Sequence, residues 1–229
     1  MVNYHRELIL SRIRHRAYET RKDIIELSRL IEEALQHELA RRREAANEEI
    51  DAAEDEEDRL FLAANHEEMV EQVGETFSRL QRYALFTTSM ATIERNFVLL
   101  CRAAKELLTL DSEFDDSKPG VIQRAVEYLE KQAGLSTNRI ANYTLLAQKL
   151  VSIRNCIVHS NGCIAERKDA KKIRDFIQEI PTIEESNGEM LKLLPGFVEN
   201  MTHSMHLLFE RLFRGVKEKA QPATSRDGV

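Results

Sequence analysis

The scarcity of helix-breaking residues is the feature that most constrains how this chain folds. Only 8 glycines and 4 prolines occur among 229 residues, and none of them precedes Gly74. All-β folds need many turns built from these residues, and nucleotide-binding α/β folds need glycine-rich loops. Leu, Ala, Glu, Arg and Lys, which favour helices, are abundant instead. The chain is therefore predicted to be all-α, with long helices.

Apolar periodicity divides the chain into predicted helices. Apolar residues recur at three- and four-residue steps over about residues 3–43. A second helical stretch covers about residues 56–110, with Gly74 as a candidate bend. This stretch is apolar around most of its circumference after Leu80, which is typical of a central core helix. Further helices are predicted at residues 119–133, from 136 or 137 to 159, at 167–179 and at 195–219, with a loop or small hairpin at 180–194.

These segments predict three parts of the chain. Residues 1–58 form a long N-terminal helix and an acidic segment, which together extend the fold. Residues 59–219 form a helical bundle. Residues 220–229 are polar and are expected to be a disordered tail.

The net charge of −6 comes from one short run of the chain. Residues 44–58 hold nine acidic and no basic residues, whereas residues 1–43 sum to +3 and residues 59–229 sum to zero. The total therefore says little about partners. The run is interpreted as a solvated helix face or a linker; the alternative is a segment that mimics nucleic acid or docks on a basic partner surface.

Cysteine usage and hydropathy predict a cytoplasmic protein without a membrane partner. Cys101, Cys156 and Cys163 are too few and too scattered for a disulfide framework or a paired-cysteine zinc site, so reduced thiols are expected. No signal-peptide core and no uncharged apolar run of 18 residues occurs. His203 and His206 have a spacing compatible with metal ligation, but two such histidines are more often part of a helix surface. No metal or cofactor is predicted.

One compact group of polar residues stands out at the end of an apolar helix. Arg154, Asn155 and His159 lie within six residues of one another, just before Ser160-Asn161-Gly162 ends the helix. Positions 155 and 159 lie one turn apart on one face, and position 154 is adjacent to 155. The neighbouring Ile153, Ile157 and Val158 are predicted to point into the core.

A guanidinium, an amide and an imidazole together suit phosphodiester chemistry. Arginine binds a phosphodiester with a forked donor and stabilises the charge that develops in the transition state. Histidine titrates near neutral pH and can move a proton to or from a ribose hydroxyl. The asparagine can orient the imidazole or the phosphate. Such a site needs no metal ion.

The motif Arg-Asn-x-x-x-His followed by Ser-Asn-Gly resembles the Rx4–6H motif of HEPN domains (higher eukaryotes and prokaryotes nucleotide-binding). The resemblance covers about residues 78–215, including the helix with Thr92-Ile93-Glu94-Arg95-Asn96-Phe97 and the closing segment 188–213. It implies a helical bundle that forms a homodimer with two motifs facing one cleft. It also implies a metal-independent endoribonuclease that leaves 2′,3′-cyclic phosphate ends.

The same resemblance implies biological partners and residue roles. Many HEPN proteins belong to toxin–antitoxin or phage-defence systems, so RNA and an antitoxin or defence-system protein are expected partners. Arg154 would contact phosphate, His159 would be the acid or base, and Asn155 would support them. Possible further supporting residues are Glu94, Ser160 and Asn161.

Two of these supporting positions have alternative interpretations. Glu94 can instead form an ion pair with Arg95 or Arg154. Asn161 stands where some HEPN toxins carry a tyrosine that a partner nucleotidyltransferase modifies, so that form of control is not implied.

A non-catalytic interpretation of the chain stays open as well. Arg154 can be a structural ion-pair residue and His159 a C-terminal helix cap, which the helix dipole favours. The bundle would then be a HEPN-like scaffold or protein-interaction module. A further possibility is that the acidic run covers the Arg154 site and restrains an enzyme.

Overall fold

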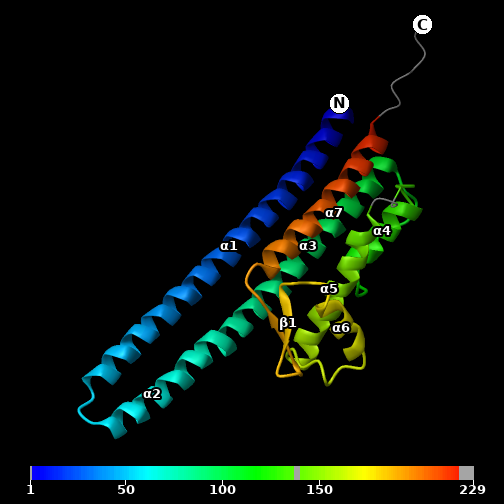
Figure 1. The fold of residues 1–229 in the computed structure, drawn as a ribbon. Coiled ribbons are helices and arrows are strands. Elements are labelled where there is room, and N and C mark those ends of the chain that lie inside the picture. The colour runs from blue at the N-terminus through cyan, green and yellow to red at the C-terminus, as the bar shows by residue number, and fades with distance from the viewer. Residues whose placement is uncertain (1, 137–139, 222–229) are drawn as a thin grey trace.

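The computed structural model describes residues 2–136 and 140–221, and it confirms the all-α fold class (Figure 1). Residues 222–229, which hold most of the predicted tail, lie outside the described part of the chain. In chain order the elements are α1 (Val2–Ala52), α2 (Glu56–Glu71), the π-helical turn η1 (Gln72–Phe77), α3 (Ser78–Leu108), α4 (Val121–Lys131), α5 (Ala141–Ser160), α6 (Ala170–Ile177), β1 (Ile183–Ser186), β2 (Met190–Leu193) and α7 (Phe197–Ala220).

The first predicted helix is longer in the structure than the expected 3–43. Its 51 residues continue through much of the acidic run, which at 1.5 Å per residue makes α1 about 75 Å long. A short turn then reverses the chain, and the Asp55 side chain accepts a hydrogen bond from the Asp58 backbone N–H at 2.8 Å. This cap starts α2, whose first turn carries Glu56, Glu57 and Asp58, next to the positive end of the helix dipole.

Residues 35–77 form an extension that we call the arm: the second part of α1, the turn, α2 and η1. The arm projects from the rest of the molecule as a helical hairpin (Figure 1). Its buried apolar side chains include Leu35, Leu39 and Val73. Gly74, the candidate bend, lies in η1, where a Cβ would stand 3.6 Å from Leu39 Cδ2. The arm is therefore held together along a narrow seam.

The remainder of the described chain, which we call the body, is organised around α3. Helices α1, α4, α5 and α7 all pack against α3. Phe86 and Phe97 of α3 are almost completely buried and contact Phe197 and Phe209 of α7 edge to face, with ring centroids 5.2 and 5.8 Å apart. Such contacts add to the hydrophobic stabilisation of a core helix, as the apolar stretch after Leu80 predicted.

The N-terminal half of α1 belongs to the same core. Leu10, Ala17 and Ile24 are buried in one apolar cluster with α3 and α7. This core therefore includes residues on both sides of residue 58, the predicted end of the N-terminal part. A bidentate ion pair joins Arg82 of α3 to Glu32 of α1, with N···O distances of 2.6 and 2.7 Å. It lies where the arm leaves the body.

The shorter predicted helices are present, with ends that differ from the predicted ones by a few residues. Residues 137–139, where the sequence places one possible start of the fourth predicted helix, lie outside the described residues, and the corresponding α5 runs from Ala141 to Ser160. The expected small hairpin is formed by β1 and β2, which pair antiparallel from Ile183↔Leu193 to Ser186↔Met190. Within residues 2–136 and 140–221, no helix has both the length and the apolar content that a membrane span requires.

Candidate functional site

The three motif residues lie on the last two turns of α5, at the molecular surface. Arg154 and Asn155 are half-buried, and His159 is exposed. Ile153 and Ile157 point into the core as predicted. The prediction for Val158 is wrong, because its side chain is 54% exposed beside His159. Position 158 lies about 100° around the helix from position 157, which turns it out of the core.

The end of α5 is determined by backbone geometry at two residues. Asn161 adopts the left-handed conformation with φ 48°, and Gly162 follows with φ 83°. The Gly162 N–H donates to the Cys156 carbonyl at 3.1 Å, which closes the last turn. A Cβ at position 162 would stand 2.7 Å from Tyr83 Cζ. Glycine is therefore required both by its φ and by the close approach of α3.

The hairpin holds this helix end in place. The Leu191 N–H donates to the Gly162 carbonyl at 2.9 Å, and the Ile164 N–H donates to the Glu189 carbonyl at 2.7 Å. The Tyr83 hydroxyl in turn donates to the Leu191 carbonyl. Strand β2 and helix α3 thus position the residues that follow His159.

Glu94 of α3 lies near Arg154, as its electrostatics show. Burial raises the pKa of the Glu94 carboxyl, and the charge of Arg154 partly opposes that rise. No ion pair joins Glu94 to Arg95 or Arg154 in the described chain. Glu94 therefore faces Arg154 across the contact of α3 with α5 without neutralising it directly.

The side chains of the three motif residues have no hydrogen-bond or ion-pair partners in the described chain. Within residues 2–136 and 140–221, no hydrogen bond or ion pair engages the side chains of Arg154, Asn155 or His159. Half-buried polar groups of this kind normally bond to protein or water. The three groups are therefore available to a ligand.

The two remaining supporting candidates, Ser160 and Asn161, serve the turn that ends the helix. The Ser160 carbonyl accepts a hydrogen bond from the Cys163 N–H at 2.7 Å. Asn161 lines a cavity of about 350 Å³ between η1 and the hairpin, together with Arg79 and Lys192. No hydrogen bond in the described chain joins either side chain to His159.

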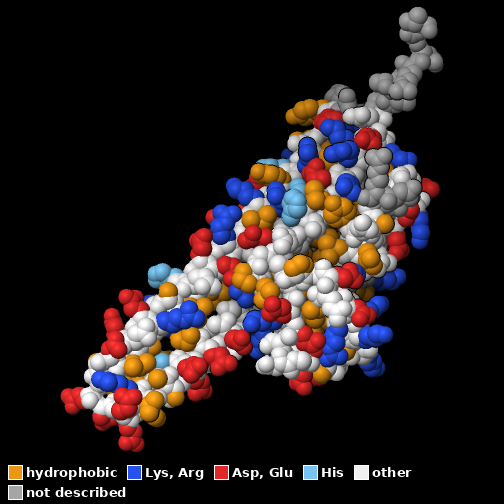
Figure 2. Space-filling view, viewed as in Figure 1, with side chains coloured by type: hydrophobic (Ala, Val, Ile, Leu, Met, Phe, Trp, Pro, Cys, Tyr) orange, Lys and Arg blue, Asp and Glu red, His pale blue; other side chains and the backbone are white. Residues whose placement is uncertain are grey.

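The acidic run does not cover this site within one chain. Residues 44–58 lie at the tip of the arm, whereas α5 lies on the other side of the bundle (Figure 1). Figure 2 shows acidic side chains gathered around that tip.

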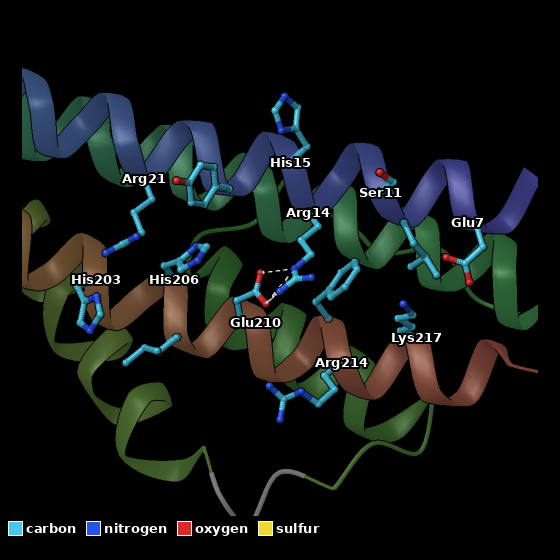
Figure 3. Close-up of a pocket in the computed structure, with 14 residues that line it drawn as sticks. Glu7, Ser11, Arg14, His15, Arg21, His203, His206, Glu210, Arg214 and Lys217 are labelled. Carbon is cyan, nitrogen blue, oxygen red and sulfur yellow. Dashed lines mark hydrogen bonds and ion pairs between the residues drawn. The ribbon is translucent and has the colours of Figure 1, made fainter.

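A second polar region was missed by sequence reasoning. A groove of about 810 Å³ lies between α1 and α7, and its lining includes Arg14, Arg21, His203 and His206 (Figure 3). Only the spacing of His203 and His206 indicated it, because the two arginines stand more than 180 residues earlier in the chain. Among the described residues, no group of three or more His, Cys, Asp or Glu side chains is placed to hold a metal ion.

Comparisons with family models, with curated proteins and with solved structures find no match to this chain.

Proposed function

We propose that this protein is a metal-independent endoribonuclease of HEPN type, acting through a site that two copies of α5 form together. The observation that carries the proposal is the surface group of Arg154, Asn155 and His159, whose side chains make no hydrogen bond or ion pair within the described chain. A toxin–antitoxin or phage-defence role is part of the same proposal.

The chemistry follows from the three side chains. Arg154 binds the scissile phosphate with its guanidinium fork and stabilises the charge that develops on the phosphorane. One His159 accepts the proton of the ribose 2′-hydroxyl while the 2′-oxygen attacks phosphorus. The bond from phosphorus to the 5′-oxygen breaks, and the second copy's imidazolium protonates that oxygen. The products are a 2′,3′-cyclic phosphate and a 5′-hydroxyl.

Neighbouring residues support these roles. Asn155 lies one turn from His159 on the same helix face and can orient the imidazole or the phosphate. Glu94 is a positioning residue, because its carboxylate attracts the Arg154 guanidinium. The exposed Val158 next to His159 offers an apolar contact for the second copy of α5.

The test is RNA cleavage by the full chain in excess EDTA. Wild-type protein is expected to cleave and to leave cyclic phosphate ends, which mass spectrometry identifies. His159→Ala should lower the rate by about 10²–10⁴-fold, the usual contribution of general acid–base catalysis. His37→Ala is the matched control, because His37 is also exposed on a helix. Equal rates for wild type and His159→Ala, or loss of cleavage in EDTA, would overturn the proposal.

The two-copy site has a test of its own. Adding excess His159→Ala protein to wild type forms mixed dimers that hold a single His159. If both histidines act in one site, the activity that remains, relative to wild type alone, should be smaller than the fraction of wild-type protein in the mixture. A proportional decrease would contradict the composite site.

A second candidate function is a non-catalytic scaffold that binds a partner protein through the arm. The arm favours it, because Leu60 and Phe61 are each 66% exposed next to the acidic tip. A photo-crosslinking residue at Phe61, introduced in cells that make the protein, should then capture one defined partner. The same residue at exposed Thr88 of α3 is the control.

A further inference from the structure

The groove between α1 and α7 brings together polar side chains from the two ends of the chain. Its volume is about 810 Å³. Figure 3 shows Arg14, Arg21 and His206 directed into the space between the helices, whereas His15 points away from it.

The charges in this groove are only partly compensated. The Arg14 guanidinium Nε lies 3.1 and 3.2 Å from the two carboxylate oxygens of Glu210, so these two side chains neutralise each other. Arg21, Arg214 and Lys217 of the lining have no ion-pair partner among residues 2–136 and 140–221. Glu7 is the remaining carboxylate of the lining. An anion in the groove therefore meets three cations that have no ion-pair partner in the described chain.

Buried polar atoms without partners lie at and behind the Arg21 end of the groove. Arg21 and His206 line the groove and also a small inner cavity of about 20 Å³, whose lining includes Thr202. That inner cavity has room for about one water molecule. Arg21 Nε and Thr202 Oγ1 are buried and lack a hydrogen-bond partner in the described chain, and Thr202 is only 1% exposed. Buried donors without partners are rare, and each one calls for an explanation such as a bound polar group.

The same surroundings lower the pKa of the His206 imidazole. Burial is the main cause that lowers the pKa of His206, and the positive charges of Arg21, His203 and Arg14 lower it further. Glu210 opposes this by raising it. An anion beside His206 would add a second opposing charge.

We propose that Arg21 and His206 form a binding site for a phosphate group carried by a ligand in this groove. The Arg21 guanidinium matches a phosphate in two parallel hydrogen bonds. The His206 imidazole supplies a single donor. The groove leaves room for the remainder of a nucleotide or for a short stretch of an RNA strand.

This site is separate from the motif on α5, and phosphate binding here does not require RNA cleavage. A free nucleotide and an RNA strand present the same phosphate chemistry, so the choice between them is left to the ligands used in the experiment.

The experiment measures binding to the full chain by calorimetry with three probes: inorganic phosphate, adenosine triphosphate and a ten-nucleotide RNA. The RNA is measured in a His159→Ala background so that it stays intact. At least one probe should bind. Arg21→Gln should weaken that binding at least tenfold, and His206→Gln should weaken it several-fold. Thr202→Val, which changes only the inner cavity, should change it less than twofold.

The matched control is Arg16→Gln, which removes the same charge from an exposed position on the same helix. It should change affinity less than twofold. Arg21→Lys keeps the charge but loses the fork, so it should have an intermediate affinity, and it replaces Arg21→Gln if that variant fails to fold.

Two results would overturn the proposal: no binding of any probe at millimolar concentration, or equal weakening by Arg16→Gln and Arg21→Gln. Binding of the triphosphate alone assigns the groove to a free nucleotide, and binding of the RNA alone assigns it to a strand. Because calorimetry with His159→Ala does not depend on cleavage, a failure here is distinct from a failure of the ribonuclease proposal.

Discussion

The body and the arm are both helical, but they are stabilised in different ways. In the body, α3 is surrounded by other helices, and residues such as Phe86 and Leu100 are fully buried. In the arm, none of the α2 residues is buried, and Leu60 and Phe61 are largely exposed. The arm therefore depends on a narrow apolar seam and on local helix propensity, which stabilise isolated helices only marginally.

This difference indicates two levels of stability in one chain. Segments with few buried apolar contacts open at lower free energy than the cooperative core. We expect the arm to exchange its amide hydrogens by local opening, and the body by global unfolding. The polar group on α5 belongs to the body, where the surrounding core holds its geometry constant.

Removing a core ring should give the largest effect and separates the two regions most clearly. Phe86→Ala should lower the free energy of unfolding by about 3–5 kcal/mol, because it removes a fully buried ring that packs on Phe197. Urea denaturation measures this change. Leu39→Ala is the matched variant in the arm, and it should speed hydrogen exchange there with a smaller effect on the urea midpoint. Equal shifts of the midpoint would show that arm and body unfold as one unit.

Gly162→Ala should have the next largest effect. The positive φ and the displaced Tyr83 ring together should cost about 2–4 kcal/mol. Gly188→Ala is the control, because Gly188 also has a positive φ of 68° but has open space around it. This control should cost about 1–2 kcal/mol. Similar losses in thermal stability for both variants would mean that the contact with Tyr83 is unimportant.

The pH dependence of stability should contain a smaller contribution from His206 in the body. Burial lowers the pKa of the folded-state imidazole below 6.5, so the unfolded chain binds more protons as the pH falls through that value. Stability is therefore lost as the pH falls through 6.5 toward the lower pKa of the folded-state imidazole. His206→Gln should make this loss smaller, as chemical denaturation at several pH values would show. An unchanged slope would contradict the burial of this imidazole.

Leu60→Ser in the arm should have the smallest effect. Its side chain is 66% exposed, so the free energy of unfolding should change by less than about 0.5 kcal/mol. If the free energy of unfolding decreased strongly, but only at high protein concentration, another copy of the chain would cover this face of the arm.

Much of the secondary structure could be predicted from the sequence. Periodic apolar residues and scarce breakers predicted the long helices, and Asn187-Gly188, both with positive φ, formed the turn of the expected hairpin. The end of the first helix was harder to place, because acidic residues neither break nor require a helix. In the structure α1 ends at Ala52, and Asp55 caps the start of α2.

For the candidate site, the sequence predicted only the relations between residues of one helix. Helix geometry places Asn155 and His159 on one face whatever the rest of the chain does. Packing of α3 on α5 was needed to bring Glu94 near Arg154, and the close approach of Tyr83 on α3 was needed to explain why position 162 has no room for a Cβ. Both relations join residues far apart in the chain.

The sequence by itself determined the helical class and the polar group on α5, because both depend on spacings of a few residues. The tertiary structure decided that α1 packs along α7, which brings Arg21 to Thr202 and His206 across about 180 residues. It also decided that the acidic run lies at the tip of the arm, away from α5. Such long-range placement follows from which apolar faces bury each other, and local spacing does not encode that choice.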